Sequence, residues 1–308
     1  MATLLSCRRH WPLLMLLVFC TGISAGVAGD RPDFTYCASA TEVRLTFSAT
    51  DQYDHGVATL QPTDFAVVDK GFIVRNFESF SRSDWTKIDV ALLLDSSQSV
   101  APHFRQEVAG ILEILTHTSG IPDENLSMFS FKAQNPAVLC VANCRATRAA
   151  EQLPAQPSGS MTPLFDTVVF CSDFLAHRGD AHTQKVLILF SDGLDTISRN
   201  SLGDAIDVAT ISEVQIYAID LTPHSTGSPG TTTLRQLASK TGGRYFTGRD
   251  GTTPTLTSLL DGFKASYTVS YRVPGRIPGY HPVRILPTQN SNLQFRSRSG
   301  YYYPNHIR

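Results

Sequence analysis

The sequence predicts an α/β protein. A doubly wound, mostly parallel sheet forms its central domain, which is inserted in or flanked by a small β-sandwich built from the N- and C-terminal segments. Three observations predict this class. Short apolar runs alternate with helical patterns through the middle of the chain, which is typical of strands covered on both faces. Apolar residues alternate with a period of two in both flanks. Neither flank has enough strands to bury a core alone.

The central elements follow one another in regular alternation. Strands are predicted at residues 89–94, 126–131, 136–141 (a short edge strand), 185–190, 213–221 and 244–247. Helices are predicted at residues 99–118, 162–177, 200–212, 233–241 and 253–263. Thr162 is a plausible cap with Pro163 in the first turn, Ser201 and Asp204 resemble a capping box, and Gly242 ends its helix. This order favours a parallel sheet with helices on both faces.

The flanking segments give the remaining strands and the domain boundaries. Alternating patterns predict strands at residues 42–49, 64–68, 73–80, 267–273, 283–285 and 293–297. We therefore predict an N-terminal β segment at residues 30–86, the central domain at 87–266, and a C-terminal β segment at 267–308 that pairs with the first. Two separate small sheets packed on the central domain are the alternative.

Residues 1–28 have the pattern of a secretory signal peptide. A basic start precedes an apolar stretch at residues 11–19, and small residues follow, so we expect cleavage between Ala25 and Gly29. The alternatives are a membrane anchor, for which the apolar stretch is short, and a lipoprotein modified at Cys20. The signal peptide predicts a secreted protein or one in the periplasm or cell envelope.

Composition narrows the classes of partner. The net charge is −1 and charged residues make up 17% of the chain, which gives no indication of binding to nucleic acid or to an anionic membrane surface. The sequence does not predict an oligomeric state.

Four cysteines remain after the predicted cleavage. An oxidising compartment permits disulfides, and Cys140 and Cys144 are close enough in the chain to pair across a tight loop. The pairing of these two with Cys37 and Cys171 stays open. A zinc site is the alternative, but it would need closely spaced cysteine pairs or histidines, which the sequence lacks.

Three loops carry oxygen side chains at the predicted carboxyl ends of strands. The motif Asp95-x-Ser97-x-Ser99 follows the first buried strand, Thr162 stands before a helix, and Asp192 follows the strand at residues 185–190. Ligands of doubly wound sheets bind at these strand ends, near the switch point. Donors that are all oxygen suit a hard divalent cation, Mg²⁺ first and Mn²⁺ or Ca²⁺ as alternatives.

These residues resemble the metal-ion-dependent adhesion site (MIDAS) of von Willebrand factor A-type domains, and the likeness covers the central domain. The resemblance implies that Ser97 and Ser99 bind the metal directly, that Asp95 and Asp192 act mainly through waters, and that Thr162 joins when a ligand is engaged. One departure is the pair of residues before Thr162, where the family often has two glycines and this chain has Ser160 and Met161.

The flanks add a narrower likeness. The segments at residues 64–71, 77–81, 190–196 and 298–302 look like those of secreted A-domain proteins common in Acidobacteria. Most of those proteins lack an assigned biochemical role, so this likeness bears on the architecture more than on the function.

The resemblance implies a binding module rather than an enzyme. We expect it to capture an acidic side chain of a protein partner through the bound cation, without a small-molecule cofactor. The sequence contains no GxSxG, HExxH or Walker motif, and Ser97 stands where an aspartyl phosphatase would carry its second acid. The alternatives are a scaffold protein with an empty site, in which these residues only cap helices, and an unrecognised hydrolase.

Overall fold

The computed structural model describes residues 42–83, 87–105, 108–110, 112, 123–132, 135–142, 144, 151–154, 156–159, 161–180, 182–222, 227–247, 259, 262–263 and 265–303. The predicted signal peptide and Cys37 lie outside these ranges. Within them, no helix has both the length and the apolar character needed to cross a bilayer.

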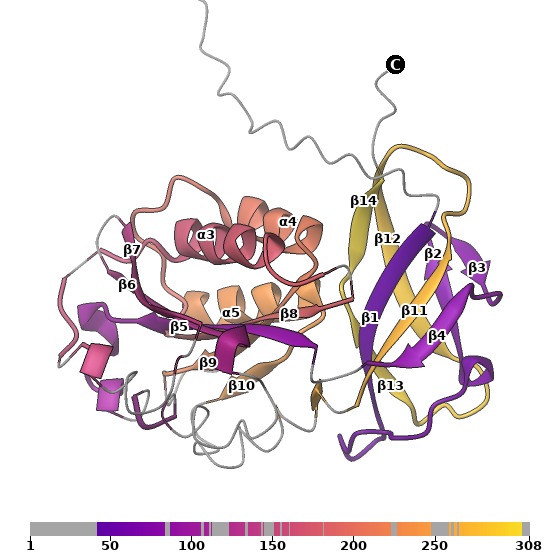
Figure 1. Ribbon diagram of the computed structural model, residues 1–308, viewed down its shortest axis with the longest axis horizontal. Coiled ribbons are helices and arrows are strands. Elements are labelled where there is room, and N and C mark those ends of the chain that lie inside the picture. Colours follow the sequence, from indigo (N-terminus) through magenta and orange to yellow (C-terminus); the bar gives the residue numbers. More distant parts are fainter. Residues whose placement is uncertain are drawn as a thin grey trace, which may run out of the picture. The chain divides into compact units, whose positions relative to one another are not determined.

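The central sheet has six strands in the order β10-β9-β8-β5-β6-β7 (Figure 1). Neighbours pair in parallel, except that β7 runs antiparallel to β6. The chain enters at β5, adds β6 and β7 on one side, and then crosses to add β8, β9 and β10 on the other. The winding direction therefore changes between β5 and β8, and the predicted doubly wound class is confirmed. The strands span Ile88–Asp95 (β5), Leu126–Lys132 (β6), Asn135–Val141 (β7), Gln184–Ser191 (β8), Val214–Asp220 (β9) and Tyr245–Thr247 (β10).

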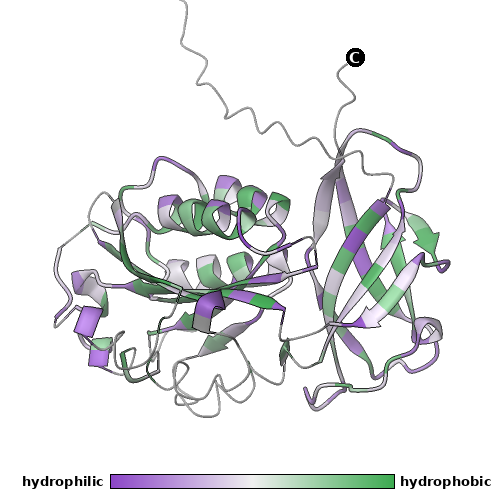
Figure 2. Ribbon diagram, viewed as in Figure 1, coloured by the Kyte–Doolittle hydropathy of each residue, from purple (hydrophilic) through white to green (hydrophobic). Residues whose placement is uncertain are grey.

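Helices cover both faces of this sheet. On one face, α3 (Leu164–Ala176), α4 (Leu202–Ile211) and α5 (Pro229–Thr241) pack through aliphatic side chains against alternate residues of the strands. On the opposite face, Val100, Phe104, Leu259 and Phe263 pack against the other set of strand residues. Every residue of β5 is consequently buried, and the strands of the sheet are strongly hydrophobic in Figure 2.

Two helix starts differ from the prediction. Helix α3 has Pro163 rather than Thr162 at its N-cap position. The main-chain N–H of Thr162 instead donates to the hydroxyl of Thr196, 2.7 Å away, which takes Thr162 out of the helical path. Helix α5 begins four residues earlier than predicted, because Ser228 caps it by accepting the N–H of Thr231 at 3.1 Å.

The other helix signals have mixed outcomes. The capping box of Ser201 and Asp204 is present on α4, and Gly242 adopts the left-handed conformation that ends α5. The predicted helix at residues 99–118 begins with a 3-10 turn, η2 (Gln98–Val100), and much of it lies outside the described residues. Most of the predicted helix at residues 253–263 lies outside them as well.

The flanking segments form two four-stranded antiparallel sheets around one core. The first sheet has the order β13-β1-β11-β4 and the second β14-β12-β2-β3, so each mixes strands from both ends of the chain. Aromatic and aliphatic side chains from both sheets share one hydrophobic cluster, which confirms a sandwich rather than two separate sheets. The strands span Glu42–Thr50 (β1), Phe65–Asp69 (β2), Phe72–Val74 (β3), Ser79–Arg82 (β4), Ser266–Arg272 (β11), Gly279–Pro287 (β12), Gln294–Ser297 (β13) and Gly300–Tyr303 (β14).

One predicted strand is wrong in its extent. Residues 73–80 were expected to form a single strand, but they contribute to β3 and β4, which belong to different sheets. Strand β3 pairs with β2, whereas β4 pairs with β11. The chain between them crosses from one layer of the sandwich to the other, and a period-two pattern cannot distinguish such a crossing from a continuous strand.

The core of the sandwich contains a buried polar network centred on Asp69. The hydroxyls of Tyr301 and Tyr271 donate to one carboxylate oxygen of Asp69 at 2.7 and 3.1 Å, and Nδ1 of His281 lies 3.0 Å from the other. Nε2 of His281 donates to the carbonyl oxygen of Ile277 at 2.6 Å. Because Asp69 and His281 are fully buried, this network links β2, β11, β12 and β14 in the interior.

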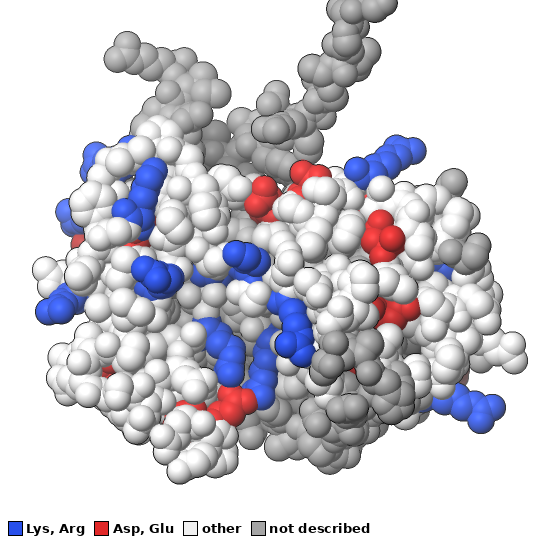
Figure 3. Space-filling view, turned by 180° about the vertical axis from the view of Figure 1, so that it is seen from behind, with Lys and Arg blue, Asp and Glu red and all other residues white. Residues whose placement is uncertain are grey.

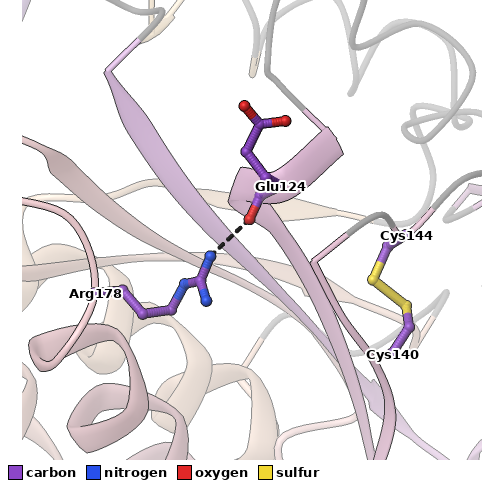
Figure 4. Close-up of a disulfide and its surroundings, with 4 residues drawn as sticks. All are labelled: Glu124, Cys140, Cys144 and Arg178. Carbon is purple, nitrogen blue, oxygen red and sulfur yellow. Dashed lines mark hydrogen bonds between the residues drawn. A yellow bond between two sulfur atoms is a disulfide. The ribbon is translucent and has the colours of Figure 1, made fainter.

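The two cysteines nearest in sequence form a disulfide (Figure 4). Cys140 lies on β7, its partner Cys144 follows that strand, and their Cα atoms are 5.8 Å apart. Cys171 on α3 is a free thiol whose pKa is raised by burial. Nearby, Arg178 donates to the carbonyl oxygen of Glu124 at 2.6 Å, which ties the end of α3 to the segment before β6.

Candidate metal centre

The candidate site lies where β5 and β8 end side by side. These strands pair in parallel through Leu94 and Phe190, so Asp95 and Ser191 end them at the same edge of the sheet. Asp192 follows directly. This edge is the switch point of the sheet, because the connections that follow β5 and β8 leave it in opposite directions.

Asp95 is held at the bottom of the site. Its side chain is fully buried and accepts the main-chain N–H of Ser97 at 3.0 Å and the hydroxyl of Ser191 at 2.7 Å. Burial raises the pKa of Asp95 from 3.8 to about 6, against the effect of these hydrogen bonds, and the charge of Asp192 adds to the rise. Two carboxylates therefore lie close enough to repel each other in a dry environment.

Ser97 and Ser99 lie in direct contact above Asp95. Their hydroxyl oxygens are 2.9 Å apart, at the start of η2. Ser97 is buried and Ser99 is exposed, so the pair runs from the interior to the surface. A neighbouring loop fixes this turn, since Ser158 donates to the carbonyl of Ser96 and Gln98 donates to the carbonyl of Gly159, both at 2.9 Å.

Asp192 is set by a tight approach of two backbones. Its carboxylate accepts the N–H of Leu194 at 3.0 Å. Gly193 has a φ of +77°, and a Cβ on it would overlap the carbonyl oxygen of Gly230 at the start of α5. Only glycine adopts this conformation readily and fits this space, so the first turn of α5 holds the loop that carries Asp192.

Thr162 is buried and attached to the loop that follows Asp192. Its N–H donates to the hydroxyl of Thr196 at 2.7 Å, and its carbonyl accepts the N–H of Thr196 at 3.0 Å. The structure thus brings Asp95, Ser97 and Ser99 together through direct contacts. It places Asp192 beside them and connects Thr162 through the backbone of a shared loop.

Ser191 belongs to the candidate site, although the sequence analysis assigned it no role of its own. It donates to Asp95 and accepts the N–H of Gly193 at 3.0 Å, so it joins the two carboxylate-bearing loops. Its position as the last residue of a buried strand, beside the end of β5, is the signal that could have identified it. Asp195 instead accepts the main-chain N–H of Phe165 in the first turn of α3, and Asp166 accepts that of Asn200 before α4.

The donor set fits a hard divalent cation. It contains two carboxylates and three hydroxyls, all oxygen, as Mg²⁺, Mn²⁺ and Ca²⁺ prefer. Among the described residues, no Lys or Arg forms an ion pair with Asp95 or Asp192. The described part of the chain contains no group of three or more His, Cys, Asp or Glu side chains that could hold a metal ion, and Cys140 and Cys144 are joined in a disulfide.

Strand order and site together define a class: a doubly wound α/β domain with a candidate cation site at the carboxyl ends of its strands. No protein-family model matches the chain, and no curated protein matches it. The fold is similar to that of proximal thread matrix protein 1 from the mussel byssus, with a TM-score of 0.45 and 16% identity over 59% of this chain and 48% of the mussel chain. The matched part therefore spans about half of that protein, one structure of which has a zinc-occupied MIDAS motif.

Two further solved structures have comparable likeness. An aerotolerance-related membrane protein from Bacteroides fragilis matches with a TM-score of 0.46 and 12% identity over 57% of this chain and 98% of that one. The manganese-loaded TRAP protein of Plasmodium vivax matches with a TM-score of 0.43 and 15% identity over 73% of this chain and 98% of that one. Because these TM-scores are low, the fold assignment rests on the strand order itself.

Proposed function

We propose that the central domain is a binding module that holds a divalent cation, Mg²⁺ or alternatively Mn²⁺ or Ca²⁺. Its ligands would be Asp95, Ser97, Ser99, Thr162 and Asp192. The observation that carries the proposal is the buried carboxylate of Asp95 beside the charge of Asp192, with no Lys or Arg ion pair to either among the described residues. Such a charge pair is costly in a dry site, and a bound cation would offset that cost.

The residues of the site would contribute to cation binding in different ways. Ser97 and Ser99 offer two neutral oxygens side by side, and Ser191 orients Asp95. The exposure of Ser99 opens the site to solvent. When bound, the cation would supply an electrophilic position that accepts a carboxylate from another molecule.

The proposed partner is a protein that presents an acidic side chain, outside the cytoplasm once residues 1–28 are removed. Met161 and Leu194 support a protein partner, since both are large apolar residues with about two fifths of their surface exposed. Met161 precedes Thr162, and Leu194 donates to Asp192. An acidic side chain that reached the cation would therefore find exposed apolar residues next to Thr162 and near Asp192.

Calorimetric titration with Mg²⁺ and Mn²⁺ tests the metal site. We expect the wild type to bind and the Asp192→Ala variant to lose binding while its circular dichroism spectrum stays unchanged. Asp173→Ala is the matched control, because Asp173 is an exposed carboxylate on α3, away from the site. Equal titrations of the wild type and Asp192→Ala would reject the site.

Capture of a partner tests the binding role. We propose binding rather than catalysis, so a partner retained from the cell envelope with Mg²⁺ should be released by EDTA and not retained by Asp192→Ala. Stability and partner binding that do not change on adding Mg²⁺ would favour a scaffold with an incidental site. Turnover of a generic ester or phosphoester that Asp95→Ala abolishes would favour a hydrolase.

A further inference from the structure

A second candidate site lies far from the metal centre in the chain's topology. A groove of about 680 Å³ is bounded by α5 and β10 on one side and by β12 and β13 on the other. Each of these elements, or the residue next to it, contributes one arginine: Arg235, Arg244, Arg284 and Arg296. Arg244 stands just before β10, at the amino end of that strand, whereas the metal centre occupies the carboxyl ends of β5 and β8.

The groove carries an excess of positive charge. No Asp or Glu lines it, and the nearest carboxylate in contact is Asp54, which pairs with Arg244 and, at 2.8 Å, with Arg296. Arg235 and Arg284 form no ion pair within the described ranges of the chain. Since the whole protein has a net charge of −1, this excess is local. Figure 3 shows a face on which Lys and Arg gather with few Asp or Glu among them.

Three of the four arginines have contacts that hold them in place, and Arg296 is held by Asp54. The guanidinium of Arg235 lies over the ring of Tyr245, 4.6 Å from its centroid, and that of Arg244 lies 5.0 Å from the centroid of Phe246. Burial lowers the pKa of Arg244, Asp54 opposes this effect, and the charge of Arg296 adds to it. Asp54 thus holds the guanidinium groups of Arg244 and Arg296 in place, but its single negative charge does not neutralise the four arginines of the groove.

Apolar side chains line the groove together with these arginines. Leu286 is 43% exposed, and Ile285 and Phe295 also line the groove. A ligand that filled this groove would therefore meet guanidinium groups and apolar surface.

We propose that this groove binds an acidic peptide segment of a partner protein, in which carboxylates alternate with apolar side chains. Arginine forks bind carboxylates in pairs of hydrogen bonds, which suits the acidic positions of such a segment. The apolar lining favours a peptide over an inorganic polyanion or an acidic polysaccharide, which would leave that surface without matching groups. The proposal does not depend on the metal site.

Fluorescence anisotropy in EDTA tests this, with a labelled synthetic peptide in which Glu and Leu alternate. The double variant Arg235→Glu and Arg284→Glu reverses the two arginines that lack ion pairs, and both are exposed on the surface, so the fold should persist. We expect this variant to bind at least about tenfold more weakly. Arg75→Glu, at an exposed arginine on the sandwich, is the matched control and should bind like the wild type.

Each outcome decides a separate part of the proposal. Equal affinity of the wild type and the double variant would overturn the groove as the site. Polyglutamate or inorganic polyphosphate that bound as tightly as the peptide would overturn the peptide preference in favour of a general polyanion site. Because the assay contains EDTA, failure of the metal-dependent function would leave the result unchanged.

Discussion

The hydroxyl of Ser191 donates a 2.7 Å hydrogen bond to the carboxylate of Asp95, and these two residues end the strands between which the sheet changes its winding direction. The bond joins the two halves of the doubly wound sheet at the point where their loops separate. It orients the carboxylate but leaves its charge in place. The stability of the metal-free protein should therefore depend on whether Asp95 is ionised.

The first prediction concerns this ionisation. The pKa of Asp95 is raised from 3.8 to about 6 in the folded protein, so the fold binds more protons than the unfolded chain between these values. The contribution of Asp95 to the free energy of unfolding should fall as the pH rises from about 4 to about 6. Above pH 6 the full loss should remain, which is about 3 kcal/mol for a shift of two pKa units. In EDTA at pH 7, Asp95→Asn should therefore be more stable than the wild type by up to about this amount.

Urea unfolding in EDTA at several pH values measures this effect. The advantage of Asp95→Asn should shrink below pH 4, where both forms are neutral, and Mg²⁺ should stabilise only the wild type. Asp173→Asn is a control for the loss of an exposed charge. A variant less stable than the wild type at pH 7 would show that the buried charge is already compensated.

The second prediction concerns the support of Asp192 by α5. A Cβ at Gly230 would overlap the carbonyl oxygen of Asp192. Gly230→Ala should therefore push the loop off the helix, lowering stability by about 1–3 kcal/mol and weakening Mg²⁺ binding. Gly203→Ala on α4 is the control: its Cβ would meet only the side chain of Ser201 at 3.5 Å, and it should stabilise by about 0.5–1 kcal/mol.

Thermal unfolding and metal titration of both glycine variants give the result. If Gly230→Ala bound Mg²⁺ as the wild type does, the position of the Asp192 loop would not depend on contact with α5.

The third prediction concerns two hydroxyls on α3. The buried hydroxyl of Ser172 has no hydrogen-bond partner among the described residues, whereas that of Thr167 donates to the carbonyl of Pro163 at 2.7 Å. Ser172→Ala should therefore stabilise the protein by about 1 kcal/mol, and Thr167→Val should destabilise it by a similar amount. Chemical denaturation of the two variants compares them directly. Loss of stability in Ser172→Ala would mean that its hydroxyl is bonded in solution.

The fourth prediction concerns the buried network of the sandwich. Tyr301→Phe removes a hydroxyl that donates to the carboxylate of Asp69 at 2.7 Å and leaves this fully buried group with one donor fewer. Stability should fall by about 1.5–3 kcal/mol, as for a hydrogen bond to a charged group. Tyr53→Phe, at a tyrosine that is 71% exposed, should change it by less than about 0.5 kcal/mol. Similar values for both variants would contradict the network.

The arrangement of the sheet could be predicted because its signals are local. Continuous apolar runs predicted the strands β5 and β8. Asp95 and Asp192 were predicted as site residues because they follow the ends of these runs. The start of α3 could not be predicted, because the main chain of Thr162 bonds to Thr196, 34 residues away. A capping rule considers only the neighbouring residues, so it placed the helix start at Thr162.

Other features depend on contacts between distant parts of the chain. The role of Ser191 requires β5 and β8 to lie side by side, and the approach of Gly230 to Asp192 requires the packing of α5. The arginines of the groove come from four separate elements, so no spacing in the sequence connects them. The metal ligands themselves stay a prediction until a cation is titrated.

The pairing of β1 with β11 has a consequence for the order in which the protein matures. Thr46 and Thr268 share a hydrogen bond although 222 residues separate them. Strand β1 can therefore pair with β11 only after nearly the whole chain has been synthesised. At about 5–20 residues per second, this delay during synthesis is roughly 10 to 45 seconds. The central sheet has all its strands within that interval, whereas β1 and β4 pair only with strands from the C-terminal segment and stay without these partners throughout it.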